Sequence, residues 1–267
     1  FSINYVLNEH RGISGTRNHA LSLATADYVM FCDADDMFIN VYSLHEILFE
    51  CAKGFDYMCG CFIEEQPDPN GGWIIFNHTK DLTFIHGKVY NKQFLIDKEL
   101  RFDEKLTMHE DGYFNTLVDL EATNKKMGTF PLYLWVWNEK SVIRSYGKEE
   151  FLFKTYPMLM EVRKAMARQI VARGFINEFY DNVVSTVINS YLDFQKPYAL
   201  NKENEEVVRK AKKSFKKFYK EFGSAYKECN IKRISDMYAV SRFNAYNNGL
   251  RLEQQTLRDF LNEIVSM

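Results

Sequence analysis

The chain has 267 residues, enough for one large domain or two modest ones. With 46% hydrophobic and 26% charged residues, its composition excludes a disordered or collagen-like protein. The formal net charge of −2 gives no general attraction to nucleic acid, and no apolar run approaches the about 18 residues of a membrane span. Five cysteines, an odd number and mostly in apolar stretches, favour free thiols in a reducing compartment. With no leader pattern at the start, we expect a cytoplasmic protein.

The first part of the chain alternates strand-like and helical patterns. Residues 3–7 are a short apolar run, and Ala20, Leu23 and Ala24 share one face of a helix. Residues 28–32 are five unbroken apolar or aromatic residues, which predict a parallel strand buried on both faces. A strand, a helix and a second strand in succession form a βαβ unit, so the predicted fold class is α/β.

The middle of the chain continues this mixture. Its patterns predict helices over 42–53 and 111–121, strands over 55–63, 73–76 and 132–137, and a polar turn over 66–72.

Beyond residue 146 the hydrophobic residues keep a helical period almost without interruption. Three stripes show it: Leu152, Tyr156, Leu159, Val162, Met166 and Ile170; Ile176, Phe179, Val183, Val187, Tyr191 and Phe194; and Val207, Ala211, Phe215, Phe218 and Phe222. Such stripes are typical of packed amphipathic helices. We therefore predict two domains, an α/β domain over 1–146 and an all-helical domain over 147–267.

Three carboxylates follow the predicted strand 28–32 in the segment Asp33-Ala34-Asp35-Asp36. In open α/β sheets, ligands bind beyond the carboxyl ends of the strands. If the segment is extended, Asp33 and Asp35 point to the same side, where two oxygen donors suit Mg²⁺ or Mn²⁺. The alternative is an acidic turn whose charges are solvated.

Two further segments carry chemistry. His109-Glu110-Asp111-Gly112 opens a predicted helix, where acidic residues are favoured by the helix dipole; a general base facing the metal cleft is the functional alternative. Residues 11–18 place two arginines around a glycine-containing loop that leads into a helix. Such a loop suits a phosphate or carboxylate partner.

Taken in order, these segments resemble glycosyltransferase family 2 of the GT-A fold. The matching stretches are 8–20, 27–36, 87–95, 101–104, 110–111 and 141–145. Relative to the family, the chain begins at what resembles the third strand, so we expect a GT-A (Rossmann-like) domain truncated at its N-terminus.

The resemblance implies a metal-dependent, inverting transfer of a sugar from a nucleotide-sugar, with a UDP-sugar as the expected donor. The acceptor would be a glycan, a lipid-linked or other precursor of a bacterial cell-surface polysaccharide, or a protein. Site residues are carried over by position: Asp111 as catalytic base; Asp33 and Asp35 on Mn²⁺ or Mg²⁺; Arg17, Asp33, Ala34, Asp35 and Arg144 on the nucleotide-sugar; His109, Glu110 and Trp137 near the acceptor.

Other features leave alternatives open. Trp137 can pack in the core or stack on an acceptor sugar, and His78 and His86 lie in the expected acceptor-side segment without an assigned catalytic role. Seven of the twelve residues 209–220 are basic and form either a solvated helix face or a contact with an anionic membrane. Homo-oligomerisation through the helices is a further expectation, and a degenerate GT-A scaffold is the alternative to an enzyme.

Overall fold

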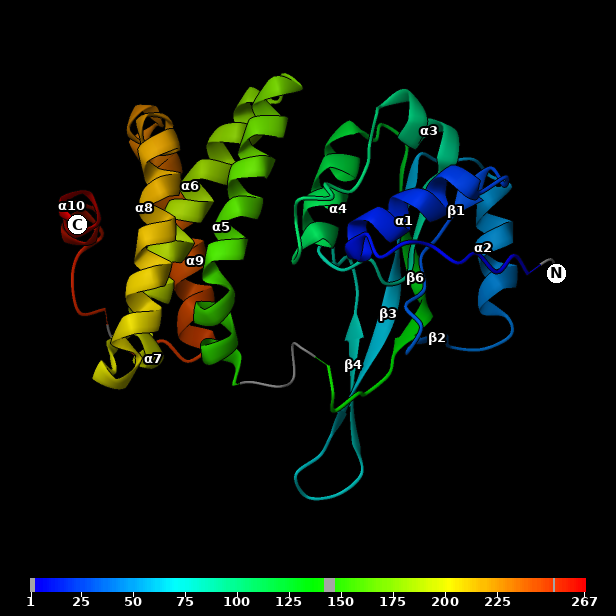
Figure 1. The fold of residues 1–267 in the computed structure, drawn as a ribbon, viewed down its shortest axis with the longest axis horizontal. Helices are drawn as coiled ribbons and strands as arrows, with labels where there is room; N and C mark the ends of the chain where they lie inside the picture. The colour runs from blue at the N-terminus through cyan, green and yellow to red at the C-terminus, as the bar shows by residue number, and fades with distance from the viewer. Residues whose placement is uncertain (1–2, 142–146, 252) are drawn as a thin grey trace. The chain divides into compact units, whose positions relative to one another are not determined.

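The computed structural model describes residues 3–141, 147–251 and 253–267. The chain forms two compact units, Phe1–Glu139 and Lys140–Met267, shown in Figure 1. The N-terminal unit contains the sheet and the C-terminal unit is helical. The boundary predicted near Tyr146 lies outside the described residues, so the exact domain limits stay a prediction.

A six-stranded mixed sheet forms the frame of the N-terminal unit. Its long strands β3 (Tyr57–Pro67) and β6 (Lys125–Trp135) pair in parallel, and every other pairing is antiparallel. The strand order is β1-β5-β3-β6-β2, with β4 paired to β3. The short strands are β1 (Tyr28–Val29), β2 (Met37–Phe38), β4 (Trp73–His78) and β5 (Lys88–Asn91).

Helices cover both faces of this sheet. The helices are α1 (Gly12–Leu23), α2 (Ser43–Cys51), α3 (Lys92–Asp97) and α4 (Glu110–Glu121). Val89 of β5 packs in one core with Ile47 of α2, whereas the ring of the next residue, Tyr90, contacts Phe114 of α4. Because successive strand residues point to opposite faces, α2 and α4 lie on opposite sides of the sheet. This three-layer arrangement confirms the predicted α/β class.

The backbones of β3, β5 and β6 come unusually close near Cys59 and Cys61, where the β3–β6 register shifts. A Cβ added at Gly60 would lie 2.4 Å from the carbonyl oxygen of Gly87 and 2.7 Å from Leu132 Cδ1. Only glycine fits this point.

Two predictions for the first 32 residues are wrong. Residues 3–7 are not a strand: they join no strand of the described sheet, and Ile3, Tyr5 and Leu7 are exposed. The run 28–32 is not a buried parallel strand, because only Tyr28 and Val29 pair, antiparallel to β5, and both are half-buried. Apolar composition alone does not specify the neighbouring strand, which here comes from residues about sixty positions away.

The C-terminal unit consists of packed helices, as the three hydrophobic stripes predicted. Its elements are α5 (Lys148–Ala172), α6 (Ile176–Asp193), α7 (Pro197–Leu200), a 3-10 helix (Lys202–Asn204), α8 (Glu205–Glu228), α9 (Ile231–Asn247) and α10 (Leu257–Ser266). Val187 of α6, Phe215 and Phe218 of α8, and Phe260 of α10 are completely buried in its core. Within the described parts of the chain, no helix has the length and apolar character required to cross a membrane.

Candidate active site

The acidic segment 33–36 is held by strand β6. The backbone N–H of Asp33 donates to the Tyr133 hydroxyl oxygen at 3.1 Å, and the same hydroxyl donates to Asp36 Oδ2 at 2.6 Å. The Val136 N–H donates to Asp36 Oδ1 at 3.0 Å. Both oxygens of Asp36 therefore serve to fasten the segment to the end of β6.

The neighbouring carboxylates remain accessible to solvent. The side chain of Asp36 is only 2% exposed, whereas that of Asp33 is 35% exposed, and Asp35 and Ala34 are exposed. Asp35 Oδ2 accepts one hydrogen bond, from Asn138 Nδ2 at 2.9 Å. A ligand arriving from solvent can thus reach Asp33 and Asp35 without breaking the anchor that Asp36 provides.

A buried arginine joins this segment to the start of α4. Arg17 of α1 donates from one guanidinium nitrogen to Asp33 Oδ1 at 3.0 Å and from the other to Glu110 Oε1 at 2.8 Å. The guanidinium also lies over the ring of Phe102. Since the side chains of Arg17 and Glu110 are only 8% and 9% exposed, solvent screens this ion pair weakly. The segment 11–18, predicted to begin as a loop, is helical from Gly12 onward.

The first turn of α4 presents two acidic residues. His109 precedes the helix in a left-handed conformation with φ of 59°, and Glu110 and Asp111 follow. Burial and the adjacent Glu110 carboxylate raise the pKa of Asp111 to about 6, although the Gly112 N–H donates to Asp111 Oδ1 at 2.7 Å. A carboxyl group with this pKa can accept and release a proton near neutral pH.

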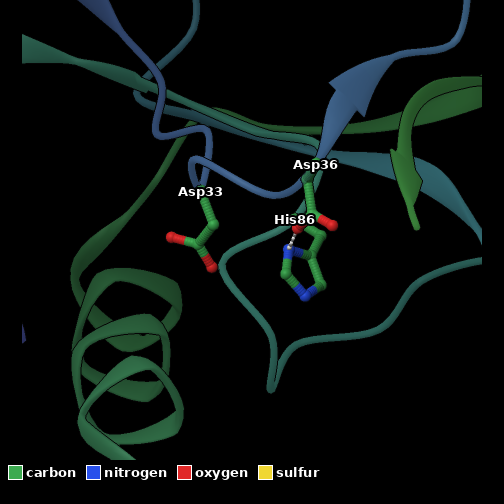
Figure 2. A group of neighbouring side chains, drawn as sticks. All are labelled: Asp33, Asp36 and His86. Atoms are coloured by element: carbon green, nitrogen blue, oxygen red, sulfur yellow. Dashed lines mark ion pairs between the residues drawn. The ribbon is translucent and has the colours of Figure 1, made fainter. Parts of the chain in front are cut away.

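A histidine from the loop before β5 completes a cluster with the acidic segment. One ligand atom each from Asp33, Asp36 and His86 lies within 4.8 Å of the others (Figure 2). Burial lowers the pKa of His86 to about 4, so its ring is neutral at pH 7. His86 Nδ1 lies 3.9 Å from Asp36 Oδ2, is buried and has no hydrogen-bond partner within the described residues. An imidazole nitrogen in this state is free to ligate a metal ion.

A second buried cation lies in β5. Lys88 is completely buried, and its Nζ has no hydrogen-bond partner in the part of the chain that the structure describes. Burial lowers the pKa of Lys88, while Cys59, Asp81 and Asp111 raise it. In return, Arg17 and Lys88 favour the ionised form of Asp111. The sequence pattern offered no sign of this lysine, since a lysine in a strand is usually exposed.

The comparison with protein families gives this arrangement a context. Residues 1–118 match the model of Glycosyl transferase family 2. The N-terminal domain is therefore similar to glycosyl transferase family 2. This match indicates a glycosyltransferase. No curated protein sequence matches the chain.

Solved structures with a similar fold include S. aureus TarS. TarS 1–349 has a TM-score of 0.51 and 17% identity, over 89% of this chain and 68% of that one. A longer TarS structure has a TM-score of 0.50 and 16% identity, over 88% of this chain and 42% of that one. TarS 1–349 in complex with UDP-GlcNAc has a TM-score of 0.47 and 18% identity, over 89% and 72%. At these identities the likeness concerns the fold.

The structure brings together most of the site residues that the sequence analysis predicted in this domain. Arg17 touches Asp33 and Glu110 directly, and Asp111 follows Glu110 at the same helix end. Trp137 is half-buried and lies two residues beyond the end of β6, because the strand predicted over 132–137 ends at Trp135. Arg144 lies outside the described residues.

Replacing Arg17 should strongly destabilise the glycosyltransferase domain. Arg17→Met removes the cation that Glu110 faces in a buried environment, and we expect it to lower the free energy of unfolding by about 3 kcal/mol. Arg11→Met is the matched control, because Arg11 is half exposed and lies 3.7 Å from an exposed Glu104, so a loss below about 1 kcal/mol is expected. Urea unfolding measures both; equal losses would contradict a special role for Arg17.

Ionised Asp111 should reduce the stability of the native protein. Because its folded pKa of about 6 lies above the ordinary value of 3.8, the unfolded chain releases this proton first, and native stability falls as pH rises from about 4 to about 6. Asp111→Asn removes this loss and keeps an acceptor for the Gly112 N–H. We expect its stability advantage over the unmodified protein to be about 1–3 kcal/mol larger at pH 7.5 than at pH 4.5. Asp27→Asn, at an exposed position, is the control; an advantage independent of pH would refute the prediction.

Proposed function

We propose that this chain is a metal-dependent, inverting glycosyltransferase that moves a sugar from a UDP-sugar to a glycan, a cell-surface polymer precursor or a glycoprotein. Asp111 is the proposed base. Asp33, Ala34, Asp35, Arg17 and Arg144 are proposed for the donor, and His109, Glu110 and Trp137 for the acceptor. The observation that carries the proposal is the Arg17 bridge, which holds the accessible Asp33 and the α4 turn bearing Asp111 in one site.

The proposed chemistry separates two tasks between the two ends of this bridge. At the α4 end, Asp111 takes the proton of the acceptor hydroxyl as its oxygen attacks the anomeric carbon. The bond from that carbon to the diphosphate breaks on the opposite side, which inverts the configuration. A pKa of about 6 leaves most Asp111 side chains ionised at pH 7.5, ready to accept this proton.

The carboxylates at the other end suit a hard divalent cation. Asp33, Asp36 and His86 each place one ligand atom within 4.8 Å of the others, and His86 Nδ1 has no hydrogen-bond partner in the described chain. Asp35 is not part of this group but offers an exposed carboxylate next to it in the chain. These donors fit Mg²⁺ or Mn²⁺. When bound, the ion would neutralise negative charge on the leaving diphosphate. Asp36 contributes less directly, since both its oxygens already accept hydrogen bonds from β6.

A UDP-sugar is proposed as the donor on two grounds. The resemblance of the motifs to the family implies it, and S. aureus TarS 1–349, which shares the fold, forms a crystal complex with UDP-GlcNAc.

Peripheral membrane contact and assembly through the helical unit remain part of the proposal. Arg209, Lys213, Lys217 and Lys220 are exposed on α8 and are the cations available to an anionic surface. Lys210 and Lys212 already pair with Glu206 and Glu263, which reduces the charge on this face. A cytoplasmic enzyme acting on lipid-linked acceptors would use such a contact.

Asp111→Asn should abolish transfer while leaving donor binding intact. Loss of a general base costs about 10²- to 10⁴-fold in rate, whereas the asparagine keeps the size of the side chain. For the unmodified enzyme, kcat/KM should fall as pH drops below about 6, because Asp111 becomes protonated. Transfer is measured as UDP release and donor binding by calorimetry. Near-normal transfer by the variant would refute the base assignment; donor binding lost together with transfer would mean that Asp111 serves the donor instead.

Asp35→Asn should remove the dependence of UDP binding on Mn²⁺. We expect UDP to raise the melting temperature of the unmodified protein more with Mn²⁺ than without, through preferential binding to the folded state. Asp35→Asn should lose that increment and keep its own stability, since Asp35 is exposed. Asp36→Asn, the comparison variant, should lower the melting temperature before any ligand is added, because it weakens the anchor to Tyr133 and Val136. An undiminished Mn²⁺ increment in Asp35→Asn would refute its role; no nucleotide binding at all, tested with UDP, GDP, CMP and dTDP, would favour a degenerate scaffold.

A further inference from the structure

The helical unit contains a polar cavity that the transfer chemistry does not use. It has a volume of about 640 Å³ and is lined by α5, α6 and α9, together with Lys196 and Asn248 beyond the ends of α6 and α9. This is the size range of pockets that hold small molecules. The cavity opens to solvent at the exposed Lys148, Asn189, Asn244 and Asn248, and charged, amide and hydroxyl side chains outnumber apolar ones in its lining.

An arginine without an ion-pair partner lies in this cavity. Arg163 of α5 is partly buried, and in the described part of the chain its guanidinium forms no ion pair. Burial lowers the pKa of Arg163, opposed by Tyr156 and Asp193. An arginine keeps its charge in such surroundings, so its planar set of donors is available to an anion.

The other charges in the cavity do not satisfy Arg163. Asp193 accepts from Lys196 Nζ at 2.7 Å, and Glu149 Oε2 accepts from the Tyr198 N–H at 2.9 Å. Lys148 is exposed at the rim. With Arg163, Lys148 and Lys196 against Asp193 and Glu149, the cavity has a formal excess of one positive charge.

The remaining lining combines amide and hydroxyl side chains with the apolar residues Leu159, Met160, Leu192 and Ala245. Asn189 and Ser190 of α6 and Ser241 and Asn244 of α9 face the cavity, and Asn248 follows at the end of α9. Amide and hydroxyl groups both donate and accept hydrogen bonds, as sugar hydroxyls do. Ser190 is buried, whereas Asn189, Asn244 and Asn248 are exposed and can reach a ligand that enters from solvent.

We propose that this cavity is a second ligand site, separate from the transferase site, for a sugar that carries a phosphate or carboxylate group. Arg163 holds the anionic group through its guanidinium, and the asparagine and serine side chains hold the sugar hydroxyls. The site is independent of the donor and base assignments, because all of its residues belong to the helical unit.

The test is a binding titration of the full chain with glucose 6-phosphate, glucuronate and neutral glucose, followed by saturation-transfer NMR. We expect saturable binding of at least one anionic sugar and much weaker binding of glucose. Arg163→Met should weaken the anionic sugar about tenfold or more, since it removes a charged hydrogen-bond donor. Arg163→Lys, which keeps the charge without the planar fork, should retain part of the affinity.

Arg168→Met is the matched control on the same helix. Arg168 is exposed, pairs with Glu221 at 2.6 Å and does not line the cavity, so its loss should leave sugar binding unchanged. Melting temperatures of all three variants establish that they are folded. No binding of either anionic sugar, equal binding by Arg163→Met, or equal binding of glucose would each overturn the proposal. The choice between glucose 6-phosphate and glucuronate identifies the anionic group.

Discussion

The two ion pairs of Arg17 connect three segments that are far apart in the chain. Its guanidinium meets Asp33 after β1 and Glu110 at the start of α4, sixteen and ninety-three positions away. Burying Glu110 and half-burying Asp33 would be costly without a cation beside each carboxylate. The shared arginine therefore sets the distance between the acidic segment 33–36 and the start of α4.

Within the acidic segment 33–36, one carboxylate is used for structure and another stays accessible to solvent. The buried Asp36 accepts hydrogen bonds from Tyr133 and Val136 with both carboxylate oxygens, and these bonds hold the segment against β6. Asp35 turns outward and keeps its carboxylate in reach of solvent. A rigid inner anchor beside an accessible carboxylate is a good basis for ligand binding, because the binding group needs little reordering.

Strong burial of charge marks the neighbourhood of the transferase site. His86 lies two residues before Lys88, the first residue of β5, and burial disfavours the charged form of both side chains. Asp111 experiences burial too, and its pKa rises toward neutrality. Such perturbed groups gather where a protein performs chemistry, since a low dielectric environment makes each charge more effective. The helical unit has its own core, centred on Phe215, Phe218 and Phe260, and its own polar cavity.

The sequence by itself determined the features that depend on local spacing. Helical periodicity predicted α5, α6 and α8, and the order of the short motifs indicated the family and the α/β class, because these signals repeat or lie within a few residues. The sequence did not determine which strands pair across long distances in the chain. The run 28–32 is apolar whichever strand it meets, so only the tertiary structure decided that β1 pairs antiparallel with β5. The burial of Lys88, the placement of His86 against Asp36 and the bridge from Arg17 to Glu110 likewise arise from contacts between distant segments. The sequence states which side chains can carry a charge. The partner and the dielectric environment that determine the effect of that charge arise only in the folded chain.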